Sequence, residues 1–221
     1  MIKIYLILKK ILPKGIYVYL QNKKRLRGLP SPIRDVVKTL QPDDITVDCG
    51  ANVGVYSQLF AKYGCKVYSF EPDPVPFREL EEKSKRFINI IPIMAAVGTN
   101  NESGKLYLDD MYESDKLFYS EHNSLVKEKN NLGDSFINIK IIDMAEWVRN
   151  FEKIKILKVD IEGYEVKLLK HLIQSRTIEK IEFVFLETHE KRIQGLQEEI
   201  IQLKKEIKSL GIEGKFFWNW P

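Results

Sequence analysis

The chain has 221 residues, of which 30% are charged and 44% are apolar. This length allows one sizeable core but not two catalytic domains of ordinary size, and the composition excludes both a membrane channel and a disordered chain. The net charge of +4 is unevenly distributed, because residues 1–40 hold ten Lys or Arg and a single acid.

Residues 1–40 are therefore expected to form a basic helical arm ahead of a single domain at 41–221. Such an arm can attract an anionic membrane surface or nucleic acid, although a charge run is often only a solvated surface. The apolar run at 4–8 is too short to span a bilayer and is stopped by Lys9 and Lys10, without a cleavage site. We expect a cytoplasmic protein, with peripheral attachment to a membrane left open.

From residue 45 onward, short apolar runs alternate with amphipathic stretches, which indicates βαβ units and a parallel sheet. The predicted strands cover residues 45–47, 66–70, 88–97, 154–159 and 181–186, and residues 216–218 would add a C-terminal strand. Pro92 cannot donate to a sheet ladder, so the third strand is expected at an edge. This predicts an α/β Rossmann-like fold with a doubly wound, mainly parallel sheet in the order 3-2-1-4-5 and helices on both faces.

Three other features of the sequence bear on the fold. Residues 99–143 interrupt the βαβ pattern and are expected to form an excursion over the active-site edge. The apolar stripe at 193–210 could form a coiled coil, but fewer than three heptads favour a helix that covers the sheet. A disulfide between Cys49 and Cys65 is not expected, because they belong to opposite edges of the predicted sheet.

The turn after the first strand, residues 48–54, reads Asp-Cys-Gly-Ala-Asn-Val-Gly. Gly50 and Gly54 allow a tight turn that brings backbone N–H groups and a helix N-terminus against a ligand. Glu71 lies 23 positions after Asp48, at the end of the second strand, and is placed to accept the hydroxyls of a ribose.

The glycine spacing disfavours other nucleotides. Neither G-x-G-x-x-G nor a phosphate loop is present, and the carboxylate of Asp48 would repel phosphates. The ammonium-carboxylate tail, ribose and adenine of S-adenosylmethionine fit the pattern better. We therefore predict S-adenosylmethionine as the cofactor, with Asp48 and Asn52 as polar groups at the lip of its site.

Between residue 45 and His189 the chain resembles the FkbM-type methyltransferases. The matching pieces are residues 47–54, 70–73, 95–97, 158–165 and 186–189. The resemblance implies a class I enzyme, usually an O-methyltransferase that acts on sugar or polyketide hydroxyls. It also implies these cofactor contacts: Asp48, Gly50, Ala51, Asn52, Gly54, Glu71 and, against the adenine, Ala96. A weaker match at 123–125 suggests Ser124 as an acceptor contact.

Asp160, Glu162 and His189 are the expected catalytic residues, because they follow the fourth and fifth strands, where α/β sheets bind ligands. The acceptor hydroxyl must be aimed at the methyl group and lose its proton. His189 is expected to be a neutral base and Asp160 an orienting group. Asp160 and Glu162 could instead be acids that favour a helix dipole, as expected for Glu165, while His171 is expected on the surface.

Glu187 is a further acceptor-binding candidate. Together with Asp160 and Glu162 it offers oxygen ligands for Mg²⁺, although no spacing defines a metal site. The sequence thus favours an S-adenosylmethionine-dependent O-methyltransferase that acts on a sugar, a glycan or a glycosylated small molecule. The alternatives are an RNA methyltransferase, for which no recognition module is visible, and an interaction protein that binds the cofactor without turnover.

Overall fold

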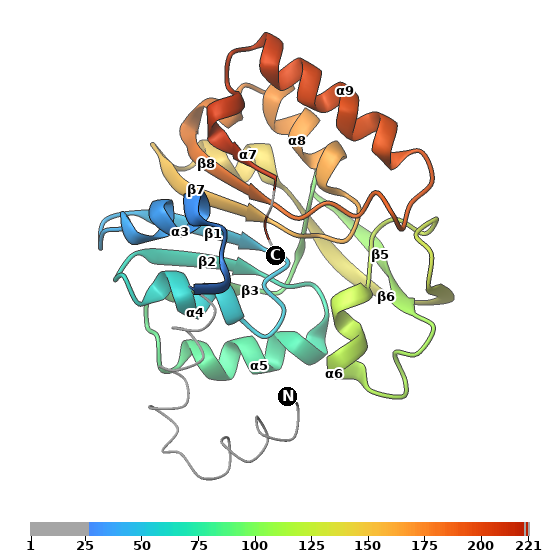
Figure 1. Ribbon diagram of the computed structural model, residues 1–221. Helices are drawn as coiled ribbons and strands as arrows, with labels where there is room; N and C mark the ends of the chain where they lie inside the picture. Colours follow the sequence, from blue (N-terminus) through green and yellow to red (C-terminus); the bar gives the residue numbers. More distant parts are fainter. Residues whose placement is uncertain (1–26, 219, 221) are drawn as a thin grey trace.

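The computed structural model describes residues 27–218 and Trp220 (Figure 1). The first 26 residues of the expected basic arm lie outside this part. Within the described part, no helix combines the length and the apolar character that a membrane crossing requires.

A parallel sheet in the order β3-β2-β1-β7-β8-β9 forms the centre of the molecule (Figure 1). Its strands are β1 (Ile45–Cys49), β2 (Lys66–Phe70), β3 (Ile90–Ile93), β7 (Ile154–Val159), β8 (Ile181–Leu186) and β9 (Phe216–Phe217). The predicted order 3-2-1-4-5 is confirmed, and β3 lies at the edge as Pro92 requires. The C-terminal strand is also present, and it runs parallel to β8.

Helices cover both faces of this sheet (Figure 1). One face packs against α3 (Ser31–Lys38), α4 (Val55–Ala61) and α5 (Pro74–Ser84), and the other against α7 (Met144–Arg149), α8 (Glu165–Gln174) and α9 (Leu196–Ser209). The apolar stripe of α9 faces the core through Leu196, Ile200, Leu203 and Ile207, as in a helix that covers a sheet. The two buried cysteines are free, in agreement with the expected absence of a disulfide.

Helix α3 changes the expected boundary between arm and domain. Leu29, Ile33, Val37 and Leu40 are at most 3% exposed and belong to the core beneath α4. The boundary predicted at residue 40 therefore lies too late, because a basic surface on α3 hides an apolar stripe that packs on the sheet. The packed domain includes the chain from Leu29 onward.

The excursion at 99–143 contains a second sheet, in the order β4-β6-β5. It is formed by β4 (Ala96–Gly98), β5 (Glu102–Asp109) and β6 (Leu132–Asp143), with α6 (Lys116–Tyr119) and a 3-10 turn at Ser120–His122 between β5 and β6. The single strand expected at 88–97 is thus divided. The division follows Pro92, because the N–H of Ala95 turns back to the carbonyl oxygen of Ile93 and the chain leaves the first sheet.

Candidate active site

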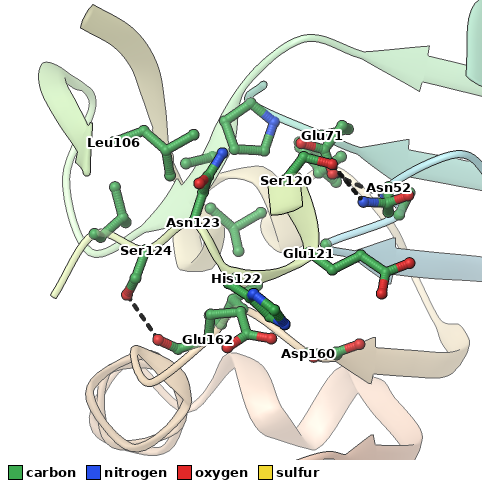
Figure 2. A pocket seen from close by; sticks show the side chains of 18 of the residues that line it. Asn52, Glu71, Leu106, Ser120, Glu121, His122, Asn123, Ser124, Asp160 and Glu162 are labelled. Carbon is green, nitrogen blue, oxygen red and sulfur yellow. Dashed lines mark hydrogen bonds between the residues drawn. The ribbon is translucent and has the colours of Figure 1, made fainter. Parts of the chain in front are cut away.

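A cavity of about 430 Å³ opens at the carboxyl ends of β1, β2, β7 and β8. In Figure 2 Asn52 and Glu71 lie at one end of it, while Asp160 and Glu162 lie at the other. Every expected site residue except Asp48 and Gly54 lines this cavity: Gly50, Ala51, Asn52, Glu71, Ala96, Ser124, Asp160, Glu162, Glu187 and His189.

The glycines of the turn are required by close packing. Gly50 has φ +74°, and a Cβ there would lie 1.8 Å from the backbone oxygen of Asp160. Gly54 has φ +73°, and its Cβ would lie 2.6 Å from Leu80 on α5. Left-handed backbone favours glycine in both places. At Gly50 the backbone contact also excludes a side chain, whereas at Gly54 the end of the Leu80 side chain would have to shift. Gly54 packs the turn against Leu80 of α5, on the side away from the cavity. Gly50 packs it against the loop after β7.

Glu71 is the fixed carboxylate at one end of the cavity. Its Oε2 accepts the N–H of Asn52 at 2.8 Å and its Oε1 accepts the N–H of Asp73 at 2.9 Å. Burial raises the pKa of Glu71 to about 8, although the two N–H donors favour the anion. The carboxylate lines the cavity with its orientation already set, and its role at a ribose stays a prediction.

Asp48 lies behind the glycine turn, fully buried, and does not line the cavity. It accepts the hydroxyl of Ser57 at 2.6 Å, and its Oδ1 lies 3.2 Å from the Nζ of Lys158. The same ammonium lies 3.2 Å from Oδ2 of Asp160 and donates to the carbonyl oxygen of Gly50 at 2.8 Å. The carboxylate of Asp48 is directed at Lys158 behind the turn, and its expected contact with a cofactor stays a prediction.

Lys158 is a buried cation that lines the cavity, and the sequence motifs assign it no role. Burial lowers its pKa, but Asp160 and Asp48 outweigh that effect and raise it, so the ammonium stays charged. The sequence does contain a sign of this contact, because Lys158 lies within the apolar strand Ile154–Val159. A charge that is buried in such a strand needs a partner of opposite charge. Lys158 links the glycine turn to Asp160, and thereby the two halves of the cavity.

His189 lies in a cluster of carboxylates. Its Nδ1 is 2.9 Å from Oε1 of Glu165, and its Nε2 is 3.2 Å from Oε1 of Glu162 and 3.9 Å from Oδ1 of Asp160. Burial lowers the pKa of His189, but the bonds to Glu162 and Glu165 outweigh burial and raise it to about 10. The expected neutral base is thus contradicted for the free protein, because the surrounding acids keep the imidazole protonated near pH 7.

Glu165 begins α8, as expected for an acid at a helix N-terminus, but it does more than favour the helix dipole. It is 1% exposed, and its Oε1 accepts the N–H groups of Ile161 and Gly163 at 3.2 and 3.0 Å. The loop after β7 therefore folds around this carboxylate, which orients His189. His171, expected on the surface, is half-buried, with Nε2 2.8 Å from Asp143.

The excursion forms the remaining wall of the cavity, as expected from its position over the active-site edge (Figure 2). Asn123 donates to Asp73 at 2.8 Å, and Asn52 donates to Ser120 at 3.2 Å. The hydroxyl of Ser124 donates to the carbonyl oxygen of Glu162 at 2.7 Å. These bonds fix the wall to both halves of the cavity, and the hydroxyl of Ser124 is already used in holding it.

Two cations from outside the expected motifs pair with Glu162. Lys129 is fully buried, with Nζ 2.5 Å from Oε2 of Glu162, and it donates to the carbonyl oxygen of His122. Arg192 is half-exposed, and its Nη1 lies 3.5 Å from the same carboxylate oxygen. Neither lies in a recognisable motif, so only the fold brings them to the site.

The sheet order and the cavity at its carboxyl edge define the Rossmann-like α/β fold of class I methyltransferases. The model of the FkbM methyltransferase domain matches residues 48–211, and the chain belongs to this family. The resemblance seen in the sequence motifs is thereby confirmed.

Individual proteins are similar over most of the chain. The hexuronic acid methyltransferase AglP of Haloferax volcanii is 29% identical over 167 residues, which cover 74% of this chain and 64% of that protein. The chain thus spans somewhat less than two thirds of that relative. A crystal structure of an FkbM methyltransferase from Methylobacillus flagellatus is 18% identical, with a TM-score of 0.45 over 79% of this chain and 39% of that one. An rRNA methylase structure from Streptococcus thermophilus is 11% identical, with a TM-score of 0.42 over 79% and 78%.

Proposed function

We propose that this chain uses S-adenosylmethionine to methylate a hydroxyl group of a sugar or glycan. One observation carries the proposal: a single cavity joins the glycine turn and Glu71 to the cluster of Asp160, Glu162 and His189. The family supports methyl transfer, and the relative that acts on a hexuronic acid supports a sugar acceptor.

The cofactor occupies the end of the cavity at β1 and β2. The tail of the cofactor would lie against the turn that begins at Gly50, and Glu71 would accept the hydrogen bonds of its ribose hydroxyls. Ala95, Ala96 and Val97 supply an apolar wall for the adenine. A cofactor held in this way would present its methyl group toward the part of the cavity at the carboxyl ends of β7 and β8.

The acceptor binds at that second end, where Asp160 is 24% exposed by side chain and held by Lys158. Transfer is an in-line displacement: the acceptor oxygen forms a bond to the methyl carbon while the carbon–sulfur bond breaks and the thioether leaves. Asp160 accepts the hydrogen bond of the acceptor hydroxyl and receives its proton. A protonated His189 holds Glu162 in place and does not act as the base.

The test is a methyl-transfer screen with labelled cofactor on hexuronic acids, neutral hexoses and their nucleotide-linked forms, with RNA as a separate arm. Calorimetry with S-adenosylhomocysteine measures the cofactor half independently. We expect binding of the product and labelling of a sugar. Labelling of RNA alone would refute the sugar assignment, and product binding without turnover on any acceptor would favour an interaction protein.

A further inference from the structure

We propose that Asp160, Glu162 and His189 form a binding site for a divalent first-row transition-metal ion of the Mn²⁺ type. One ligand atom from each of the three side chains lies within 4.8 Å of the others. Asp160 and Glu162 come from the loop after β7, and His189 comes from the loop after β8. The three donors therefore converge from neighbouring parallel strands on the wall of one cavity.

The imidazole of His189 is oriented as a metal ligand. Glu165 holds Nδ1 at 2.9 Å, which leaves Nε2 facing Glu162 and Asp160. Histidine ligands in metalloproteins generally donate a hydrogen bond from the N–H of their second ring nitrogen to such a carboxylate. This bond fixes the orientation of the ring and its tautomer. Glu165 is fully buried and held by two backbone N–H groups, so this support is rigid.

Carboxylates outnumber the lysine and arginine side chains around the cluster. Carboxylates linked by ion-pair contacts in and beneath the cluster are Asp48, Asp160, Glu162, Glu165 and Glu187. The lysine and arginine cations paired with them are Lys158, Lys129 and Arg192. In the free protein the protonated His189 is a fourth cation, and a bound metal ion would take the place of its proton. With a neutral imidazole as ligand, five carboxylates then face three side-chain cations, and a divalent ion gives neutrality. Glu187 Oε1, 3.9 Å from Nε2 of His189, is available as a fourth ligand.

The mixture of donors decides the type of ion. Mg²⁺ and Ca²⁺ prefer oxygen ligands throughout, whereas an imidazole beside carboxylates suits Mn²⁺, Fe²⁺ or Zn²⁺. The role of this ion rests on the proposed function. An ion at this place would bind the acceptor hydroxyl oxygen next to the transferred methyl group. It deepens that function by assigning the ligands of a metal at the acceptor end.

The test measures Mn²⁺ binding to the full chain by electron paramagnetic resonance, after EDTA treatment and dialysis. We expect one Mn²⁺ per chain in the wild type, and a loss of at least about tenfold in affinity in His189→Gln. His171→Gln is the matched control, because it removes an imidazole paired with Asp143 outside the cluster. Circular dichroism monitors the fold, and Asp160→Asn, at a partly exposed ligand, tests the same cluster if His189→Gln does not fold.

Calorimetry with S-adenosylhomocysteine in each variant separates the two proposals. Wild-type protein that binds this product but no Mn²⁺ would overturn the metal site and leave the proposed function intact. Equal Mn²⁺ affinity in wild type and in a folded cluster variant would also overturn it. Displacement of Mn²⁺ by an equal concentration of Mg²⁺ would refute the assignment to a transition-metal ion.

Discussion

Lys158 donates a hydrogen bond to the carbonyl oxygen of Gly50 at 2.8 Å, across the boundary between β7 and the turn after β1. The same ammonium lies between the carboxylates of Asp48 and Asp160, each 3.2 Å away. One side chain thus fixes the floor of the cofactor end and the orientation of an acid at the acceptor end. Lys158 therefore connects the cofactor end and the acceptor end of the cavity through one hydrogen bond and two ion pairs.

Lys158→Met should lower the free energy of unfolding by about 3–5 kcal/mol, because it leaves the buried Asp48 and the partly exposed Asp160 without their cation. Urea unfolding followed by circular dichroism measures the loss. Lys153→Met is the control, since Lys153 pairs with Glu182 on the surface and is 65% exposed by side chain. That pair should contribute at most about 1 kcal/mol. Similar losses in the two variants would show that Lys158 has no special structural role.

Gly50→Ala tests whether close packing or only backbone strain requires glycine in the turn. Left-handed backbone alone should cost alanine about 1–2 kcal/mol. Gly195→Ala measures this strain by itself, because Gly195 has φ +83° and nothing within 4 Å of its Cβ position. At Gly50 the contact with Asp160 should add about 1–3 kcal/mol of overpacking. Equal destabilisation of the two variants would argue against the packing explanation.

The sequence predicts those parts of the molecule that depend on local patterns. Strand order follows from alternating apolar runs and from Pro92, and the turn follows from its two glycines. The direction of Asp48 could not be predicted, because it depends on Lys158, 110 positions later in the chain. The pairing of β4 with β6 and the approach of Lys129 to Glu162 are likewise long-range contacts. No local pattern distinguishes such a residue from a solvated one.

Helix α3 illustrates the opposite problem, in which a local pattern fits two structures. Its apolar positions are equally compatible with a detached basic arm and with a helix packed on the domain. Ile33→Ala should distinguish them, because Ile33 is 1% exposed and its truncation should cost about 2–5 kcal/mol. Ile201→Ala, at a residue 45% exposed on α9, should change stability by no more than about 0.5 kcal/mol. If the unfolding curve of Ile33→Ala matches that of the wild type, α3 does not pack on the domain and belongs to the basic arm.

The raised pKa of Glu71 predicts a pH dependence of cofactor binding. With a pKa of about 8, much of the carboxyl is protonated at pH 7 in the free protein. Ribose hydroxyls donate hydrogen bonds and favour the anion, so binding should release this proton. If the pKa falls below 7 in the complex, affinity for S-adenosylhomocysteine should rise about tenfold between pH 7 and pH 9. Calorimetry at several pH values measures this rise.

Glu71→Gln provides the control, because glutamine keeps the size of the side chain and removes the titration. At pH 9 the affinity of Glu71→Gln for S-adenosylhomocysteine should be lower than that of the wild type. The rise in affinity between pH 7 and pH 9 that comes from residue 71 should disappear. The folded wild type holds a proton on Glu71 that the unfolded chain loses above its ordinary value of 4.5. Stability should therefore fall as pH rises from 4.5 toward 8, and this fall should be smaller in Glu71→Gln. Identical pH profiles of binding in both proteins would remove Glu71 from the ribose site.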